Sequence, residues 1–234
     1  MLKRIMDCRV KPGNDSGETM ASSIYVFDAY GTLFNVHAAI GRHRDACGPD
    51  ADRMSEMWRT KQLEYSWTLT LSGQYVDFWE LTQRALDFSL ARTPSVDRGL
   101  RQQLLDAYFQ LDAFPDARAT LRRLKDAGHR TGILSNGSPP MLKGAIDAAG
   151  VGADLDAVLS VDSVKMYKPR REVYALVTDH FNCKPQDVTF VSSNRWDVMG
   201  AQAFGFRTAW INRSKMPEEY GAADTILSDL SALH

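Results

Sequence analysis

Short apolar segments alternate with stretches of helical spacing along most of the chain, beginning at Ser23. Five such segments stand out: SIYVFDAY, RTGILSN, AVLSVD, DVTFVSS and RTAWIN. Most of them lead through a loop into a segment whose apolar residues recur every three or four positions. Strands that alternate with helices in this way are typical of a parallel sheet covered on both faces. The pattern therefore predicts an α/β fold with a doubly wound, mainly parallel sheet.

A long helical segment interrupts this alternation between the first and second predicted strands. It runs from Val36 to about Pro115, which is far more chain than one crossover helix needs. Its aromatic residues include Trp58, Tyr65, Trp67, Tyr75, Phe78, Trp79 and Phe88. We therefore predict an inserted helical cap over residues 36–113, with a core domain made of residues 23–35 and 114–234.

Residues 1–22 differ from the rest of the chain. They are polar, include Pro12, Gly13 and Gly17, and have neither helical nor strand periodicity, so we predict that they are disordered. Met20 stands just before the first predicted strand. One hypothesis is that translation of the natural protein begins at this methionine.

Overall composition narrows the class of protein. Hydrophobic residues make up 44% of the 234 residues, and the formal net charge is -1, so the chain can bury a core but has no long-range positive field to hold nucleic acid or an anionic membrane. No apolar run is long enough to cross a membrane and no signal-peptide core is present, which favours a cytoplasmic protein. Cys8, Cys47 and Cys183 have no CxxC spacing and are expected to be reduced thiols.

Candidate chemistry gathers near the ends of the predicted strands, where ligands of open parallel sheets bind. Four clusters stand out: Asp28 in FDAYGT; Ser135 and Asn136 in LSNGSP; Lys168 in VKMYKP; and Ser192, Asn194 and Asp197 in VSSNRWD. A desolvated carboxylate can attack carbon or phosphorus to form a covalent ester or acyl phosphate, so Asp28 is the candidate nucleophile. Gly31 allows a sharp turn after it, and Thr32 offers a hydroxyl to the carboxylate. A lone Asp-x-x-Gly more often caps a turn, but the other clusters favour chemistry.

Taken in order, FDAYGTLF, LSNGSP, YKP and SSNRWD resemble the four motifs of the haloacid dehalogenase superfamily, over about Ser23 to Asn212. Most members of that superfamily are magnesium-dependent phosphatases, with a second acid two residues after the nucleophile and an acidic fourth motif. This chain has Tyr30 at the first of these positions, and its fourth motif leaves only Asp28 and Asp197 as carboxylates for a hard cation. The resemblance implies a Rossmann-like core and chemistry without metal or cofactor. A magnesium-dependent small-molecule phosphatase is the alternative.

The missing acid, the Tyr-Gly-Thr sequence, WRTKQLEY and GFRTAWINR are similar to the L-2-haloacid dehalogenase (type II) branch of that superfamily. The resemblance implies that Asp28 displaces halide from a short 2-haloacid with inversion, and that water then hydrolyses the ester to give a 2-hydroxyacid. Arg59 would stabilise the departing halide, although an arginine on a cap helix is more often a solvated residue. The branch also implies a homodimer.

The same resemblance assigns the remaining site residues. Substrate-binding residues would be Ala29, Tyr30, Arg59, Leu63, Phe78, Ser135, Asn136 and Trp196. Catalytic residues would be Asp28, Thr32, Arg59, Ser135, Lys168, Tyr174, Ser192, Asn194 and Asp197. Asn136 and Phe78 would line the halide pocket, while Ser135 and the backbone N–H groups after Asp28 would hold the substrate carboxylate.

Within the catalytic set, Lys168 would pair with Asp28 and Asp197 and keep both ionised. Tyr174 would hydrogen-bond into this group, and Asn194 and Asp197, supported by Ser192, would orient the hydrolytic water. Structural alternatives exist for several residues: a surface lysine for Lys168, core packing for Tyr174 and Phe78, and a helix cap for Asp197.

Two other classes of function are less consistent with the sequence. A catalytically idle scaffold is disfavoured because every expected polar position is filled, and a serine hydrolase is disfavoured because no GxSxG elbow is present. Ala29, Thr60, Lys165 and Met166 depart from the branch beside the predicted pocket. The preferred haloacid and halide, fluoroacetate included, therefore stay open.

Overall fold

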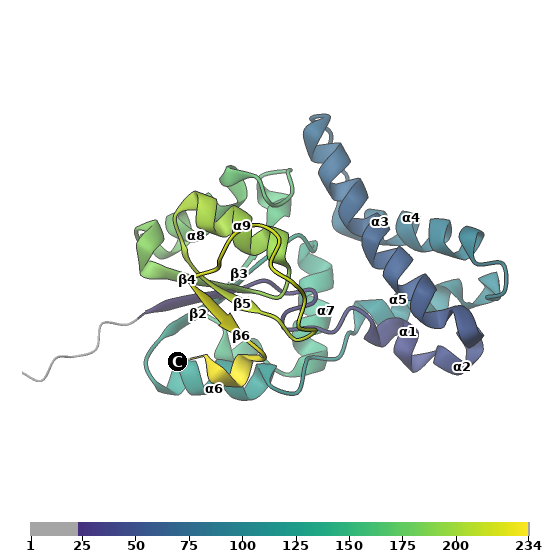
Figure 1. Cartoon of the computed structure of the whole chain (residues 1–234), viewed down its shortest axis with the longest axis horizontal. Coiled ribbons are helices and arrows are strands. Elements are labelled where there is room, and N and C mark those ends of the chain that lie inside the picture. Colours follow the sequence, from purple (N-terminus) through teal and green to yellow (C-terminus); the bar gives the residue numbers. More distant parts are fainter. Residues whose placement is uncertain (1–22, 234) are drawn as a thin grey trace, which may run out of the picture.

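The computed structural model describes residues 23–233 and contains a six-stranded sheet beside a group of helices (Figure 1). All neighbouring strands are parallel, in the order β3-β2-β1-β4-β5-β6. The strands are β1 (Ile24–Phe27), β2 (Arg130–Ser135), β3 (Ala157–Ser160), β4 (Val188–Ser192), β5 (Arg207–Ile211) and β6 (Thr225–Leu227). The predicted doubly wound α/β fold is confirmed. The predicted disordered segment, residues 1–22, lies outside the described residues.

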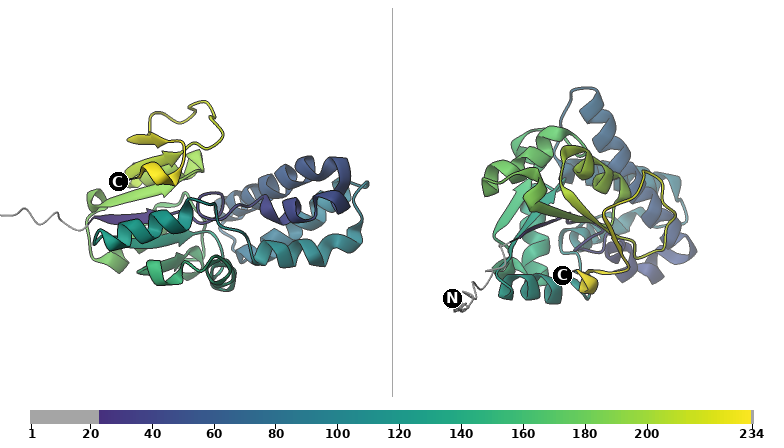
Figure 2. Two further views of the ribbon diagram at one scale, coloured as in Figure 1. Left: turned by 90° about the horizontal axis from the view of Figure 1, so that it is seen from below. Right: turned by 60° about the vertical axis from the view of Figure 1, so that its left-hand side comes forward.

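The sheet has helices on both faces (Figures 1 and 2). Helices α6 (Ala117–Asp126) and α7 (Pro139–Ala149) lie on one face, and α8 (Arg171–Phe181) and α9 (Arg195–Phe204) lie on the other. The chain runs outward from β1 through β2 to β3 and then returns to β4 on the other side of β1. This reversal opens a crevice beyond the carboxyl ends of β1 and β4, where such folds bind their ligands.

A group of helices stands beyond the carboxyl ends of the strands (Figures 1 and 2). Its members are α1 (Ala38–Arg42), α2 (Arg44–Cys47), α3 (Ala51–Leu71), α4 (Phe78–Arg92) and α5 (Arg101–Phe109). Short 3-10 helices connect the regular elements: Gly48–Asp50, Arg98–Leu100, Gly152–Asp154, Val161–Ser163, Pro185–Asp187 and Leu230–Ala232. The five α-helices coincide with the segment predicted as a cap, and we propose them as a cap subdomain.

The longest of these helices, α3, is positioned by one buried side. Its buried residues are Ala51, Met54, Ser55, Trp58, Gln62 and Ser66, a spacing of three or four residues that keeps them on one face of a helix. The Trp58 indole N–H donates to the Thr82 carbonyl of α4 at 2.8 Å. This hydrogen bond holds α3 against α4. Because Trp58 faces α4, the next residue, Arg59, projects from a neighbouring side of the helix.

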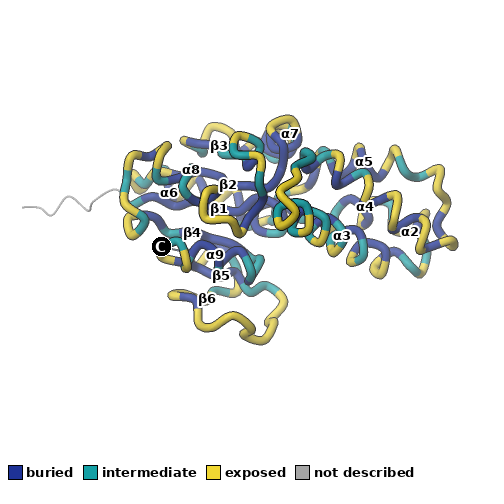
Figure 3. Tube along the Cα trace, turned by 90° about the horizontal axis from the view of Figure 1, so that it is seen from above, coloured by how far each residue is buried: buried dark blue, intermediate teal, exposed yellow. Residues whose placement is uncertain are grey.

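Burial follows these layers (Figure 3). The central strands are buried along nearly their whole length, with Val26, Phe27 and Phe190 fully enclosed, whereas the edge strand β6 is exposed or half-buried. The sequence pattern missed β6 because no apolar run marks it. Within residues 23–233, no helix is both long and apolar enough to span a membrane. Cys47 and Cys183 are free thiols, and Cys8 lies outside the described residues.

Candidate active site

Asp28 directly follows β1, and only 7% of its side chain is exposed. Its backbone N–H donates to the Val191 carbonyl at 2.9 Å, which extends the β1–β4 ladder by one residue and fixes the carboxylate at the crevice. Gly31 then turns the chain with a φ of 93°, a conformation that favours glycine.

The carbonyl of Ala29 organises the turn that follows Asp28. It accepts from the N–H groups of Thr32, Leu33 and Phe34, and the Gly31 N–H donates to the Phe34 carbonyl. Those four backbone donors are therefore occupied. The backbone N–H groups after Asp28 are predicted to hold the substrate carboxylate. Of these, the N–H groups of Ala29 and Tyr30 take no part in the bonds of this turn.

Side chains from several parts of the chain hold the Asp28 carboxylate. Lys168 donates to Oδ1 at 3.1 Å. Oδ2 accepts from Asn194 at 2.7 Å, from Thr32 at 3.1 Å and from Ser192 at 3.5 Å. These donors include a charged group and are all side chains, so the geometry does not fit a carboxylate that merely caps a turn. The predicted nucleophile is held in one orientation at the centre of a polar cluster.

Lys168 lies between two buried carboxylates. Its ammonium is 3.1 Å from Asp28 and 2.8 Å from Asp197, and its side chain has no exposed surface. Burial lowers the pKa of Lys168, but the charges of Asp197 and Asp28 outweigh this effect and the net shift of the pKa is upward. Lys168 is therefore charged over the physiological range, and the alternative of a surface lysine is wrong.

Asp197 lies in the first turn of α9 and is fully buried. Its Oδ1 accepts from the Tyr174 hydroxyl at 2.7 Å and its Oδ2 from Lys168. The N-cap residue of α9 is Asn194, so the alternative of Asp197 as the helix cap is wrong. Burial raises the pKa of Asp197 to about 6; Lys168 opposes this shift and Asp28 adds to it. A carboxylate with a pKa close to neutral suits a general base.

Two loops are joined around the carboxylate. The Thr32 hydroxyl accepts from the Ser193 backbone N–H at 2.8 Å, and the Ser192 hydroxyl accepts from the Asn194 N–H at 3.0 Å. The Asn194 side chain also donates to the Tyr30 carbonyl at 3.1 Å. The loops after β1 and β4 thus form one hydrogen-bonded unit, which orients the predicted catalytic side chains.

Arg59 reaches this unit from the helical part of the molecule. Its guanidinium donates to the Tyr30 carbonyl at 3.2 Å and to Asn194 Oδ1 at 3.4 Å. Among the described residues, no carboxylate forms an ion pair with Arg59, so its charge is available to an anion. Because Arg59 is half-buried and its guanidinium is bonded to Tyr30 and Asn194, the alternative of a solvated helix residue is wrong. Leu63, four residues later on α3, is half-buried on the same side of the helix.

The aromatic side of the site is closely packed. The Tyr30 ring stacks on Tyr108 at 5.9 Å and also contacts Phe78 at 6.2 Å. Phe78 is 1% exposed and opens α4, which begins after the Asp77 cap. Phe78 thus belongs to the core as well as lying beside the predicted pocket. Tyr108 was missed, because a tyrosine within a helix such as α5 gives no signal beyond simple packing.

The second strand contributes the last predicted polar positions. Ser135 ends β2 and is fully buried, and its hydroxyl accepts from the Gly137 N–H at 3.0 Å. Asn136 is also buried, and its side-chain oxygen accepts from the Lys168 backbone N–H at 3.1 Å. This bond joins the loop after β2 to the lysine between the two carboxylates, so both residues lie at the same polar cluster.

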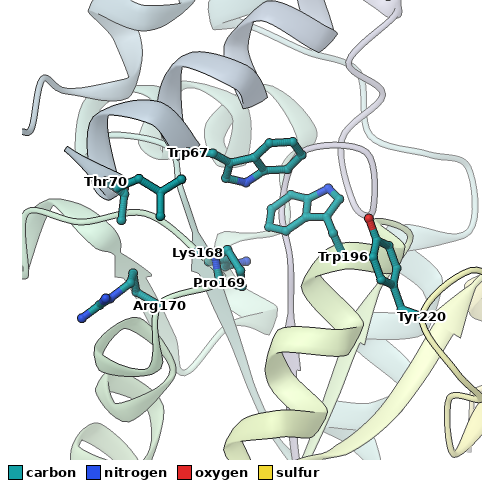
Figure 4. A pocket seen from close by; sticks show the side chains of 8 residues that line it. Trp67, Thr70, Lys168, Pro169, Arg170, Trp196 and Tyr220 are labelled. Carbon is teal, nitrogen blue, oxygen red and sulfur yellow. The ribbon is translucent and has the colours of Figure 1, made fainter. Parts of the chain in front are cut away.

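Two cavities are lined in part by residues of this site or by their neighbours. One, of about 410 Å³, is lined by Trp67, Thr70, Leu71, Lys168, Pro169, Arg170, Trp196 and Tyr220 (Figure 4). The other, of about 300 Å³, has a more polar lining that includes Gly31, Asn35, His37, Arg59, Asn194 and Arg213. Trp196 meets Trp67 edge to face at 5.4 Å, so the predicted pocket residue Trp196 contacts the helical part directly. Trp67 was missed, although its position eight residues after Arg59 on one helix is a signal that could have found it.

The donor set is a poor match for a metal centre. Within the described part of the chain, no group of three or more His, Cys, Asp or Glu side chains is arranged to hold a metal ion. Two residues after Asp28 stands Tyr30, and burial raises the pKa of its phenol well above the usual value, so it supplies no anionic ligand. Asp28 and Asp197 already share the Lys168 ammonium. This set suits a singly charged substrate better than a magnesium-bridged phosphate.

Comparison with known proteins points to one family. A model described as haloacid dehalogenase-like hydrolase matches residues 23–205. The chain is 50% identical over 211 residues to (S)-2-haloacid dehalogenase 1 of Pseudomonas sp. (strain CBS-3), which covers 89% of this chain and 93% of that protein. A crystal structure of a dehalogenase is 46% identical, with a TM-score of 0.88 over 91% of this chain and 95% of that one. An L-2-haloacid dehalogenase from Xanthobacter autotrophicus with chloropropionic acid covalently bound is 35% identical, with a TM-score of 0.80 over 90% and 96% of the two chains.

Proposed function

The chain belongs to the haloacid dehalogenase-like hydrolase family, and we propose that it hydrolyses the carbon–halide bond of short (S)-2-haloacids. The observation that carries this proposal is the Asp28 carboxylate, buried and held by Lys168, Asn194 and Thr32. Such a carboxylate is shielded from water but remains an oriented nucleophile. The similarity to (S)-2-haloacid dehalogenases supports the same reaction.

In the first half-reaction, an oxygen of Asp28 attacks C2 of the substrate from behind. A C–O bond forms, the carbon–halide bond breaks, and the halide leaves with the electron pair while the configuration at C2 inverts. Arg59 stabilises the negative charge that develops on the halide, with Asn136 and Phe78 beside it. Ser135 and the backbone donors of Ala29 and Tyr30 hold the substrate carboxylate.

In the second half-reaction, water hydrolyses the ester on Asp28. Asp197 accepts a proton from the water, Asn194 and Ser192 orient it, and the hydroxide adds to the carbonyl carbon of Asp28. Both Asp28 oxygens have donors, so the oxygen that stays as the carbonyl is stabilised as charge builds on it. The bond between the Asp28 carbonyl carbon and the ester oxygen then breaks, and the departing alkoxide takes the proton that Asp197 accepted. The C2–O bond stays intact, and the product leaves as a 2-hydroxyacid while Asp28 is again a carboxylate.

The decisive experiment measures halide release from chloroacetate and from each enantiomer of 2-chloropropionate, with EDTA present. We expect release by the wild type, selective for the (S)-enantiomer, and none by Asp28→Asn. Asp45→Asn, which changes an exposed carboxylate on α2, is the matched control and should behave as the wild type. No release from any haloacid, together with magnesium-dependent phosphate release from small phosphate esters, would assign the chain to the phosphatase alternative.

Isotope labelling tests the ester directly. In a single turnover in labelled water, the label should enter Asp28 and not the product, because the water adds to the Asp28 carbonyl. Label found first in the 2-hydroxyacid would mean that water attacks C2 itself. Retention of configuration at C2 would contradict attack from behind.

We further propose a cytoplasmic homodimer. The free thiols of Cys47 and Cys183 are consistent with a reducing compartment, and Phe88 is a large apolar side chain exposed on α4, as a contact between copies would require. Light scattering coupled to size exclusion measures the oligomeric state. A mass of one chain at micromolar concentration would rule out the dimer.

A further inference from the structure

Tyr108 and Gln62 form a buried polar pair that takes no part in the two half-reactions described above. Tyr108 is 2% exposed, and its ring stacks on Tyr30 with the ring planes 10° apart. Its hydroxyl donates to Gln62 Oε1 at 3.3 Å. Gln62 is fully buried on α3, three residues after Arg59. Burial of a hydroxyl and an amide is costly unless both are hydrogen-bonded, so a simple apolar core would be easier to build here.

A chain of hydrogen bonds fixes the orientation of the Gln62 amide. The Thr82 hydroxyl donates its only proton to the Phe78 carbonyl at 2.8 Å, because a carbonyl oxygen can only accept. The Thr82 oxygen in turn accepts from Gln62 Nε2 at 3.0 Å. The side-chain oxygen of Gln62 therefore faces Tyr108 as an acceptor. The hydroxyl proton of Tyr108 is committed to Gln62, and its oxygen is left to accept from another donor.

The guanidinium of Arg59 is that donor. Burial raises the pKa of Tyr108, while the charge of Arg59 and a hydrogen bond between the two side chains act in the opposite direction. A guanidinium has five N–H donors and no acceptor, so it can only donate to the phenol oxygen. Its Nη2 also donates to the Tyr30 carbonyl and to Asn194 Oδ1. Three partners thus hold Arg59 in one orientation, and N–H donors remain for an anion.

We propose that Tyr108 and Gln62 are positioning residues that hold the Arg59 guanidinium where it receives the departing halide. The inference rests on the proposed dehalogenation. A long side chain that had to reorient while the carbon–halide bond breaks would add to the activation barrier, whereas a donor held in place beforehand does not. Both residues act through Arg59, and Thr82 supports them by fixing the direction of the hydrogen bonds.

The test is a single turnover of Tyr108→Phe, which removes the hydroxyl and keeps the ring. We expect ester formation to slow roughly tenfold, and the loss to be larger for (S)-2-chloropropionate than for (S)-2-bromopropionate, because chloride is the poorer leaving group. Hydrolysis of the ester should keep its wild-type rate, since the halide has already left. An unchanged rate of ester formation, or an equal loss in both steps, overturns the proposal.

A double-mutant cycle assigns the effect to Arg59. In the Arg59→Gln background, Tyr108→Phe should cause almost no further loss, because no guanidinium is left to orient. Losses that multiply in full would mean that Tyr108 acts independently of Arg59, and they would overturn the proposal.

Two further variants complete the test. Gln62→Leu removes the acceptor of the Tyr108 proton and should reproduce the larger loss for chloride. Tyr65→Phe, which removes a hydroxyl from a half-buried tyrosine on α3, is the matched control and should release halide as the wild type does. A loss of the same size in Tyr65→Phe would overturn the proposal. If the wild type itself releases no halide from any haloacid, the proposed dehalogenation has failed.

Discussion

Lys168 and Asp197 form an ion pair of 2.8 Å in which neither side chain has any exposed surface. A buried ion pair is tolerated only when both charges keep their partners, because burial of a single charge is costly. The same ammonium also contacts Asp28, so one lysine pairs with both carboxylates that we propose as nucleophile and general base. The stability of the fold and the chemistry of the site therefore depend on one residue.

Replacement of Lys168 by methionine should abolish halide release and destabilise the protein. Two buried carboxylates would lose their positive partner, and loss of one member of a buried pair typically costs about 3–5 kcal/mol. Urea unfolding measures this change in free energy. The control is Lys143→Met, which removes an exposed lysine paired with Asp147 on α7. It should change the free energy of unfolding and the rate of halide release very little. Equal stabilities for the two variants would mean that the carboxylates do not depend on Lys168.

The rate of ester hydrolysis should fall as the pH drops through about 6. Burial raises the pKa of Asp197 to about 6; above this pH the group is an anion that can accept a proton from water, and below it the group is neutral and cannot. Lys168 keeps its charge, because its pKa is raised. Rapid acid quenching followed by mass spectrometry should therefore find more ester on Asp28 at pH 5 than at pH 8. Ester levels that do not change with pH would remove Asp197 from the role of base.

Tyr174→Phe should raise the pH below which the rate of ester hydrolysis falls. The Tyr174 hydroxyl donates to Asp197 at 2.7 Å, and this bond lowers the pKa of Asp197 by stabilising the anion. Without it, the carboxyl stays protonated to a higher pH, while the rate on the alkaline plateau should change much less. The pH profile of kcat separates this effect from general damage, which would lower the rate at every pH. A profile that keeps the wild-type midpoint would show that Tyr174 only packs.

Much of the site could be predicted because parallel strands bring their carboxyl ends together. Asp28 after β1, Ser135 at the end of β2 and Ser192 at the end of β4 had to meet once the sheet was recognised. The place of Arg59 could not be derived in this way. Its direction depends on how Trp58 packs against α4, and no periodicity along α3 contains that information. Only the similarity of WRTKQLEY to a known branch indicated it.

The features that were missed arise from contacts between segments without a regular pattern. β6 is a short and exposed edge strand, so it lacks an apolar run. Tyr220 lies in a segment between β5 and β6 and lines the same cavity as Trp67 and Trp196. The pairing of Arg195 with Glu218 joins charges 23 residues apart. Such contacts depend on the path of a loop, which local propensity does not determine.

The strongest test of Arg59 uses the leaving group. If its guanidinium stabilises the departing halide, Arg59→Gln should slow ester formation by roughly 10²–10³-fold, and more for chloride than for bromide, because the poorer leaving group needs more stabilisation. Single-turnover halide release from (S)-2-chloropropionate and (S)-2-bromopropionate measures this step without the later hydrolysis. Arg53→Gln, on the same helix with an exposed pairing to Asp50, is the matched control. An equal loss of rate for both halides would contradict a role in halide departure. Arg59 would then act by binding the substrate carboxylate, or by holding Asn194 in place through the hydrogen bond of 3.4 Å between the two side chains.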